Sequence, residues 1–168
     1  MIYFITGGER SGKSKYAQKL ALELSGHPVY IATSRLWDKD FEKRVRHHKT
    51  ERDKNWITIE EEKLLSKIDL KDKVAVIDCI TLWLTNYWVD TNYDIEKSLK
   101  QAKREFDILS SIDCTLIIIS NEIGMGVHAQ TEKGRKFVEL QGWINQYIAA
   151  KADKVVFMVS GIPVQIKV

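Results

Sequence analysis

The eight-residue segment from Gly7 to Ser14 most constrains what this chain can fold into. It reads Gly-Gly-Glu-Arg-Ser-Gly-Lys-Ser and matches the P-loop pattern G-x-x-x-x-G-K-[ST]. A P-loop binds phosphate only when a β-strand delivers it and an α-helix follows, because the loop amides and the helix N-terminus form the anion site together. The apolar run Met1–Ile5 precedes the segment, and the amphipathic run Lys15–Leu24 follows it. The sequence therefore predicts a strand, a phosphate-binding loop and a helix, in that order.

The individual positions of this segment have separate physical roles. Gly7 and Gly12 allow backbone angles and a close approach of phosphate that a side chain would prevent. Lys13 can reach the β- and γ-phosphates as a mobile positive charge, and the Ser14 hydroxyl can ligate Mg²⁺. A glycine-rich turn without phosphate is the alternative, which the flanking strand and helix patterns disfavour. We expect the whole segment to bind nucleotide: Gly7, Gly8, Glu9, Arg10, Ser11, Gly12, Lys13 and Ser14.

Composition narrows the class of protein. The 168 residues suit one domain, residues 1–168, with a single core. The net charge of +3 does not call for a nucleic-acid or membrane partner. The chain has neither an apolar run of about 18 residues nor a signal-peptide pattern, so we expect a cytoplasmic protein without an integral membrane segment. The two cysteines, Cys79 and Cys114, lie in or beside apolar runs and are predicted to be buried thiols.

Strand and helix patterns alternate along the chain, which is typical of a doubly wound α/β fold. Continuous apolar runs such as Val74–Ile77 and Leu116–Ile119 imply burial on both faces, hence a mostly parallel sheet. Only Ser160–Pro163 separates the last two strands, so we expect an antiparallel C-terminal hairpin. The predicted strands are Met1–Thr6, Val29–Ala32, Trp56–Ile59, Val74–Asp78, Thr115–Ser120, Val155–Val159 and Val164–Val168. The predicted helices are Lys13–Ser25, Lys39–Arg52, Glu61–Lys67, Thr81–Val89, Ile95–Ser111 and Thr131–Ala152.

Two acidic residues at strand ends are candidates for the site. Asp78 ends a buried apolar strand in the manner of a Walker B carboxylate, which holds the Mg²⁺ shell in P-loop enzymes. Its alternative is a helix N-cap, because a helix is predicted to follow. Glu122 follows another apolar strand and is expected at the same sheet edge as the P-loop, as a general base or Mg²⁺ partner. Its alternative is a structural cap.

The segment from Arg44 to Arg52 combines two adjacent histidines, His47 and His48, with several cations. A solvated basic helix face is the plain interpretation. A metal site is disfavoured, because adjacent histidines on a helix point about 100° apart. The sharper hypothesis is a nucleophile beside a polyanion. A neutral imidazole can attack the α-phosphorus of a nucleotide and form a phosphoramidate, while the cations stabilise the departing pyrophosphate.

Together these segments resemble the bifunctional adenosylcobinamide kinase / adenosylcobinamide-phosphate guanylyltransferase family of cobalamin biosynthesis. The histidine pair and the run Asn121–Gly126 are the most specific parts of a resemblance that extends from end to end. The chain departs from the family at Asp53-Lys54 and Val127–Ala129, where the family often has proline. The other matching parts are Thr6–Ser14, Tyr30–Ser34, Arg44–His48, Arg52, Trp56, Thr58, Glu60, Asp78–Asn86 and Ser160–Pro163.

The resemblance implies two reactions. In the first, ATP or GTP gives its γ-phosphoryl group to the aminopropanol hydroxyl of adenosylcobinamide. In the second, GTP guanylylates a histidine, here His47, and the GMP passes to adenosylcobinamide phosphate, giving adenosylcobinamide-GDP. The catalytic residues would be His47, Lys13 and Glu122, with Mg²⁺ held by Ser14 and Asp78. Further nucleotide contacts would come from Thr33, Ser34, Arg35, His48, Lys49, Thr50, Glu51, Glu60 and Asp78.

The resemblance also implies a RecA-like P-loop fold and a homotrimer. Trp83, Tyr87 and Trp88 crowd one predicted helix, where core packing is the default and a subunit interface or a contact with the corrin ring is the alternative. His27 and His128 are interpreted as surface residues. A nucleic-acid binder is disfavoured, because the basic residues cluster at one predicted helix.

Two rival functions remain open from the residues themselves. One is a P-loop kinase for another small metabolite, which would form no covalent nucleotide intermediate. The other is a nucleotide-binding switch, which would hydrolyse nucleotide slowly until a partner stimulates it. The sequence does not decide between ATP and GTP in the kinase step.

Overall fold

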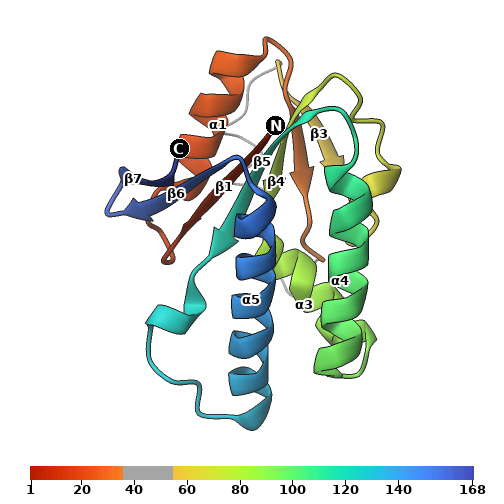
Figure 1. Ribbon diagram of the computed structural model, residues 1–168, viewed down its shortest axis with the longest axis vertical. Coiled ribbons are helices and arrows are strands. Elements are labelled where there is room, and N and C mark those ends of the chain that lie inside the picture. The colour runs from red at the N-terminus through yellow and green to blue at the C-terminus, as the bar shows by residue number, and fades with distance from the viewer. Residues whose placement is uncertain (36–54) are drawn as a thin grey trace.

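A seven-stranded sheet organises residues 1–35 and 55–168, the part of the chain that the computed structural model describes (Figure 1). The strand order is β3-β2-β4-β5-β1-β6-β7, and every pairing is parallel except that between β6 and β7. The predicted mostly parallel sheet with a C-terminal antiparallel hairpin is confirmed. The strands are β1 (Ile2–Gly7), β2 (Val29–Ala32), β3 (Ile57–Glu60), β4 (Val74–Asp78), β5 (Thr115–Asn121), β6 (Lys154–Val159) and β7 (Ile162–Lys167).

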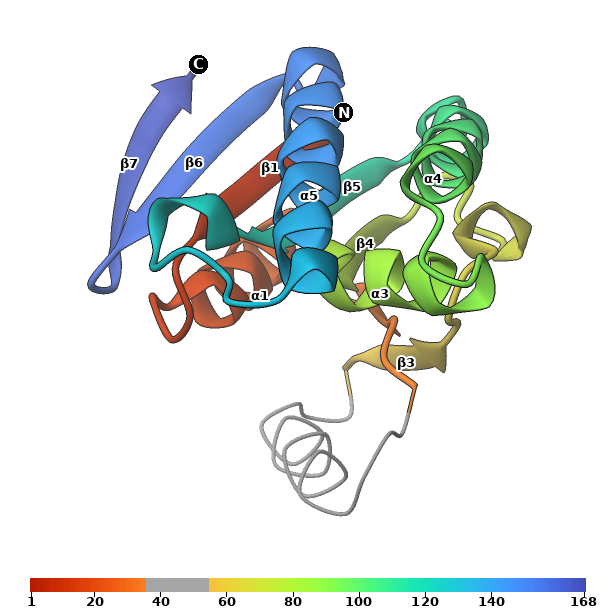
Figure 2. The same cartoon turned by 90° about the horizontal axis from the view of Figure 1, so that it is seen from below.

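Helices cover both faces of this sheet, as Figure 2 shows. In β1, Phe4 packs into the core shared with α3, α4 and α5, whereas Ile5 packs against Ala17 and Ala21 of α1. This alternation follows from the two-residue period of a strand, and it makes the fold doubly wound as predicted. The helices are α1 (Lys13–Leu24), α3 (Ile80–Asp90), α4 (Ile95–Ser110) and α5 (Glu132–Lys151).

The predicted helix Glu61–Lys67 is wrong, because only a short 3₁₀ turn, η1 (Leu65–Lys67), forms there. The Glu61 carboxylate accepts hydrogen bonds from the backbone amides of Lys63 and Leu64, and Glu105 accepts one from the amide of Ser66. The amides of Lys63 and Leu64 would be unpaired in the first turn of a helix, but the Ser66 amide would bond within it, and Glu105 takes that amide proton instead. Leu65 of this turn is fully buried and belongs to the hydrophobic core.

The C-terminal hairpin has a tighter turn than the sequence predicted. Its strands are joined by Ser160 and Gly161 alone, with φ of 50° and 84°. Two consecutive residues with positive φ match the strand twist in a two-residue hairpin, so Ile162 already belongs to β7. The other described elements agree with the predictions to within one or two residues. The predicted helix Lys39–Arg52 lies outside the described residues. None of the described helices is long and apolar enough to cross a membrane.

The parallel alignment brings the carboxyl ends of several strands to the same end of the sheet, which we call its carboxyl edge. Gly7 pairs with Asn121 across β1 and β5, and Ala32 pairs with both Asp78 and Glu60 across β2, β4 and β3. The P-loop and the segments that follow β2, β4 and β5 therefore start from the same edge, where ligands bind in open α/β sheets.

Candidate nucleotide-binding site

The P-loop has the backbone geometry that its glycines predict. Gly12 has φ of 95°, in the left-handed region, and stands at the N-cap of α1. A Cβ on Gly7 would lie 2.6 Å from the Met158 carbonyl oxygen and 2.8 Å from Ser11 Oγ, so no side chain fits there. The loop leads from β1 directly into the N-terminus of α1 at Lys13, which is the arrangement that binds phosphate.

Lys13 is buried and folds back into the loop. Its Nζ donates a hydrogen bond of 2.5 Å to the Gly8 carbonyl oxygen, and lies 3.5 Å from Ser11 Oγ. Burial lowers the pKa of Lys13, and the nearby carboxylates of Asp78 and Glu9 oppose that shift only in part. A bound phosphate would act in the same direction as these acidic groups and favour the charged ammonium.

Asp78 lies beside the start of α1, although the two are far apart in sequence. Its Oδ2 accepts a hydrogen bond of 2.9 Å from Ser14 Oγ and one of 2.6 Å from the Tyr30 hydroxyl. The helix-cap interpretation of Asp78 is wrong, because Cys79 is the N-cap of α3 and no side chain caps that helix. The Asp78–Cys79 peptide bond is cis. Tyr30 was not predicted as a site residue; a hydroxyl-bearing side chain on an apolar strand was the one available signal.

The pair Ser14 and Asp78 fits a nucleotide-bound Mg²⁺. Both offer hard oxygen donors, which this cation prefers, and they are already within hydrogen-bond distance of each other. Mg²⁺ in such sites takes one or two protein ligands, and phosphates and water supply the rest.

Glu122 lies next to the strand that carries the P-loop. Its backbone amide donates to the Gly7 carbonyl oxygen at 3.0 Å, and its Oε2 accepts from Asn145 Nδ2 at 3.3 Å and from Thr6 Oγ1 at 3.5 Å. It precedes the short 3₁₀ turn η2 (Ile123–Met125), which its side chain does not cap. The structure therefore brings this carboxylate to the P-loop, while its role as a base or Mg²⁺ partner stays a prediction.

Arg35 belongs to a group of charged side chains farther along the edge, which we call the Arg35 cluster: Arg35, Glu62, Lys63 and Asp90. Arg35 donates two hydrogen bonds to Asp90, at 2.6 and 2.8 Å, and one of 2.5 Å to Glu62, while Lys63 Nζ donates to Asp90 at 2.8 Å. The carboxylates of Asp90 and Glu62 raise the pKa of Arg35, and Arg35 and Lys63 hold the pKa of Asp90 well below its usual range.

The remaining residues that were predicted to contact nucleotide differ in how deeply they are buried. Thr33 is fully buried, and its hydroxyl donates to the Cys79 carbonyl oxygen at 2.8 Å. Ser34 is half-buried, and Glu60 is exposed at the end of β3. Contacts of these three residues with nucleotide stay predictions. Five predicted residues lie outside the described part of the chain, and their roles stay predictions: His47, His48, Lys49, Thr50 and Glu51.

Several other predictions concern residues away from the chemistry. Trp83, Tyr87 and Trp88 are buried in the core, so core packing is confirmed and an exposed aromatic face on α3 is wrong. Cys79 and Cys114 are buried free thiols as predicted. Burial raises the pKa of the Cys79 thiol to about 12, which keeps it protonated. The surface positions of His27 and His128 are confirmed.

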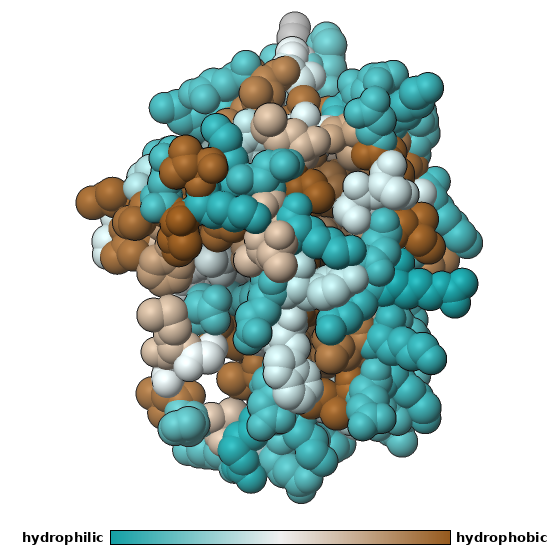
Figure 3. Space-filling view, in the orientation of Figure 1, coloured by the Kyte–Doolittle hydropathy of each residue, from teal (hydrophilic) through white to brown (hydrophobic). Residues whose placement is uncertain are grey.

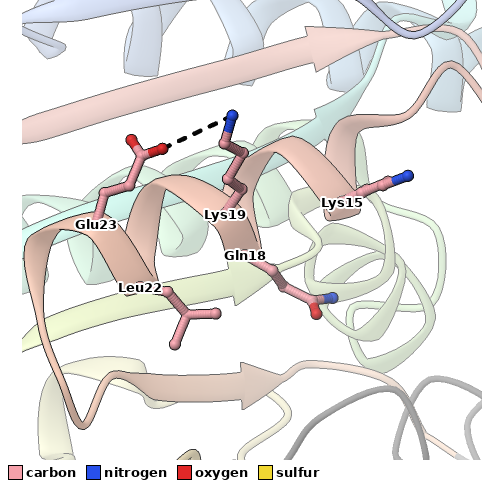
Figure 4. A pocket seen from close by; sticks show the side chains of 5 residues that line it. All are labelled: Lys15, Gln18, Lys19, Leu22 and Glu23. Atoms are coloured by element: carbon pink, nitrogen blue, oxygen red, sulfur yellow. Dashed lines mark ion pairs between the residues drawn. The ribbon is translucent and has the colours of Figure 1, made fainter.

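A depression on the surface of α1 is separate from the P-loop contacts (Figure 4). Its lining comes from one helix face: Lys15, Gln18, Lys19, Leu22 and Glu23. Lys19 and Glu23 form an exposed ion pair there, 3.8 Å apart. Since one helix supplies the whole lining, this depression lacks the converging polar groups of a catalytic site.

Comparison with known proteins gives a match over nearly the whole chain. The family model described as cobinamide kinase / cobinamide phosphate guanyltransferase matches residues 3–166. The bifunctional adenosylcobalamin biosynthesis protein CobP of Pseudomonas aeruginosa is 34% identical over 167 residues, covering 97% of this chain and 95% of that protein. The corresponding protein CobU of Escherichia coli K12 is 32% identical over 182 residues, covering 99% of this chain and 100% of that protein.

Two solved structures that align with this chain have lower sequence identity to it. The flagellar accessory protein FlaH from Methanocaldococcus jannaschii aligns with a TM-score of 0.49 and 13% identity, covering 99% of this chain and 77% of that one. The RadB recombinase aligns with a TM-score of 0.48 and 15% identity, covering 93% of this chain and 73% of that one.

Proposed function

This chain belongs to the cobinamide kinase / cobinamide phosphate guanyltransferase family and is a transferase, and we propose that it carries out both reactions of adenosylcobinamide activation in cobalamin biosynthesis. ATP or GTP first phosphorylates adenosylcobinamide. GMP from GTP then passes through a guanylyl-histidine to the resulting phosphate, giving adenosylcobinamide-GDP. We place the enzyme in the cytoplasm, as the sequence predicts.

The observation that carries this proposal is the family match over residues 3–166 together with the contact between Ser14 and Asp78 beside the P-loop. The match supports the substrates, and the contact supports the nucleotide chemistry. Ser14 and Asp78 would hold Mg²⁺, which when bound neutralises charge on the phosphates.

In the kinase reaction, the P-loop amides and Lys13 hold the β- and γ-phosphates. The adenosylcobinamide hydroxyl oxygen forms a bond to the γ-phosphorus, the bond between that phosphorus and the β–γ bridging oxygen breaks, and ADP or GDP leaves. Glu122 takes the hydroxyl proton as a general base. Support for this role comes from its backbone hydrogen bond to Gly7, which fixes it beside the loop.

In the guanylyl transfer, His47 is the nucleophile. An imidazole nitrogen forms a bond to the α-phosphorus of GTP, and pyrophosphate leaves as the bond from that phosphorus to the α–β bridging oxygen breaks. An oxygen of adenosylcobinamide phosphate then displaces the imidazole. The cations of the Arg44–Arg52 segment support this proposal, because they suit a triphosphate. Further nucleotide contacts are proposed for Thr33, Ser34, Arg35, His48, Lys49, Thr50, Glu51 and Glu60.

We also propose a homotrimer, and the C-terminal hairpin supports self-association. Val159 of β6 pairs with Ile162 of β7, and both side chains are exposed, at 46% and 65%. Val164 is exposed as well, and Figure 3 shows hydrophobic surface over this hairpin. Light scattering should give three times the 19.4 kDa chain mass, and Ile162→Ser should lower that mass. A wild-type monomer would reject the trimer.

The decisive experiment for the chemistry uses GTP labelled at the α-phosphate. Wild type, His47→Ala and His48→Ala are incubated with it, denatured, and tested for retained label that is acid-labile and alkali-stable. Label on wild type and His48→Ala, but not on His47→Ala, is the expected result. Label that survives in His47→Ala and is lost in His48→Ala would move the nucleophile by one residue. No label on active wild type would favour a P-loop kinase for another small metabolite.

A further inference from the structure

A row of buried polar side chains runs from the middle of α5 to Glu122. Ser120 of β5 is fully buried, and Gln141 and Asn145 of α5 are 1% and 5% exposed. Ser120 Oγ donates to Asn145 Oδ1 at 2.7 Å, and Gln141 Nε2 donates to both Ser120 Oγ and Asn145 Oδ1, at 2.9 Å each. Asn145 Nδ2 in turn donates to Glu122 Oε2 at 3.3 Å and to the Asn121 carbonyl oxygen at 3.2 Å.

These contacts fix which way the Asn145 amide points. Its oxygen accepts from two donors, Ser120 and Gln141, so turning the amide over would set its NH₂ group against the NH₂ group of Gln141. The NH₂ group faces Glu122, because the reverse orientation would also place the amide oxygen against two acceptors, Glu122 Oε2 and the Asn121 carbonyl oxygen. Gln141 keeps this arrangement although its own Oε1 is buried without a partner among the described residues, which costs stability.

As a result, the two carboxylate oxygens of Glu122 differ in their hydrogen bonding. Oε2 accepts from Asn145 and Thr6, whereas Oε1 accepts no hydrogen bond from the residues that the structure describes. One oxygen is held and the other is available to a substrate. Asn145 itself lies between Ile144 and Ile148 along a helix whose Leu140, Ile144 and Ile148 are fully buried, so the donor stands on a rigid element.

We propose that Asn145 is a positioning residue for Glu122. By holding Oε2, it aims Oε1 at the hydroxyl group that attacks the γ-phosphorus, so that the proton of that hydroxyl passes to Oε1 as the oxygen–phosphorus bond forms. Ser120 and Gln141 set the direction of the Asn145 amide. This inference rests on the proposed kinase reaction and assigns to α5 a part in it. Positioning of this kind matters because an error of about 1 Å in a reacting group can cost on the order of 10²-fold in rate.

The test is a double-mutant cycle with Asn145→Leu, Glu122→Gln and the double variant. The kcat for phosphorylation of adenosylcobinamide with ATP is measured, together with the KM for ATP. Asn145→Leu should lower kcat about tenfold with little change in KM, and it should have no further effect when Glu122 is already glutamine. Ser98→Ala is the matched control, since Ser98 is a fully buried polar side chain on α4 that bonds to Thr91 and Asp94 and should leave kcat unchanged.

Two kinetic results would overturn the inference: a folded Asn145→Leu enzyme with wild-type kcat, or losses that multiply in the double variant, which would mean that Asn145 acts independently of Glu122. If Asn145→Leu does not fold, Gln141→Met replaces it in the cycle. That change removes one of the two donors that orient Asn145, and a smaller loss of the same kind is expected.

A second measurement separates this inference from the proposed function. A wild-type enzyme that leaves adenosylcobinamide unphosphorylated would reject the proposed reaction. A crystal structure of Asn145→Leu tests the positioning without any substrate. Glu122 should then adopt another rotamer or lose a defined position, and an unchanged Glu122 would overturn the inference.

Discussion

Asp78 and the Arg35 cluster are two polar networks at the same edge of the sheet, and they are built in different ways. Asp78 is bonded to neutral hydroxyl groups, Ser14 at 2.9 Å and Tyr30 at 2.6 Å. Asp90 in the Arg35 cluster is bonded to the cations of Arg35 and Lys63. The side chains of Arg35 and Asp90 are 24% and 32% exposed, whereas Tyr30 is almost fully buried.

The two networks differ in how far the charge of the carboxylate is balanced by neighbouring cations. Asp78 forms no ion pair with a lysine or arginine of the described residues, although Lys13 lies near enough to interact with it, so its oxygens remain suited to a cation such as Mg²⁺. A carboxylate paired with two cations is already compensated, and exposed pairs of this kind contribute little to stability. Tyr30→Phe and Asp90→Asn test this contrast directly, and Lys13→Ala and Lys19→Gln provide the largest and the smallest expected effects for comparison.

Lys13→Ala should have the largest effect on activity. It removes the charge that the P-loop places at the β- and γ-phosphates, and loss of one such stabilising group costs on the order of 10²–10³ in kcat. Steady-state kinetics with ATP and adenosylcobinamide measure it. Lys15→Ala is the control, because Lys15 is exposed two residues away on the same helix. Equal losses in the two variants would show that general positive charge, rather than the position of Lys13, matters.

Tyr30→Phe should have the next largest effect. It removes a buried hydrogen bond to a charged carboxylate, which contributes roughly 1.5–3 kcal/mol, and it frees Asp78 to turn away from Ser14. Both the free energy of unfolding and the Mg²⁺ concentration for half-maximal kcat should be measured, and the second should rise. Tyr147→Phe is a close match, since the Tyr147 hydroxyl also donates to an aspartate, Asp107, at 2.6 Å but at an exposed site.

The Tyr30 and Tyr147 variants should differ both in stability and in Mg²⁺ requirement. The Tyr147 change should cost less than about 1 kcal/mol, because its carboxylate partner is solvated, and it should not alter the Mg²⁺ requirement. If Tyr30→Phe leaves the Mg²⁺ requirement as it is in wild type, the hydroxyl holds the fold together and does not orient Asp78.

Asp90→Asn should destabilise the protein by about 0.5–1 kcal/mol at neutral pH, with less effect at high salt. Because Arg35 and Lys63 depress the pKa of Asp90 in the folded protein, its stabilising contribution is present above the ordinary aspartate pKa of about 3.9. It is lost as pH falls through the folded pKa. Urea unfolding of both proteins should therefore show a stability difference at pH 7 that shrinks below about pH 4. A difference that grows in acid would contradict this sign.

Lys19→Gln should have the smallest effect. It breaks the pair with Glu23, which spans 3.8 Å between side chains that are 77% and 58% exposed. Such helix pairs contribute about 0.3–0.5 kcal/mol. Thermal unfolding should barely change, and activity should be that of wild type. A clear loss of activity would show that the depression on α1 takes part in function.

Much of the fold could be predicted because its signals are local. The apolar runs that became β4 and β5 are continuous, and the short separation of the last two apolar runs was enough to predict an antiparallel hairpin, although its turn is two residues shorter than expected. The helix prediction at Glu61–Lys67 was wrong because Glu105, distant in sequence, takes the Ser66 amide proton. Such a competition between side chain and helix is decided only once the chain is folded.

In the candidate site, too, some features could be predicted from local sequence and others depend on tertiary structure. The sequence by itself determined the P-loop, since its glycines and Lys13 act within eight residues, and it marked Asp78 and Glu122 as strand-end carboxylates. Only the tertiary structure decided that Ser14 and Tyr30 share one oxygen of Asp78, and that Asn145 of α5 holds Glu122. Those partners are 23 to 64 residues apart. No spacing rule relates them, because strand order and helix packing set their distances.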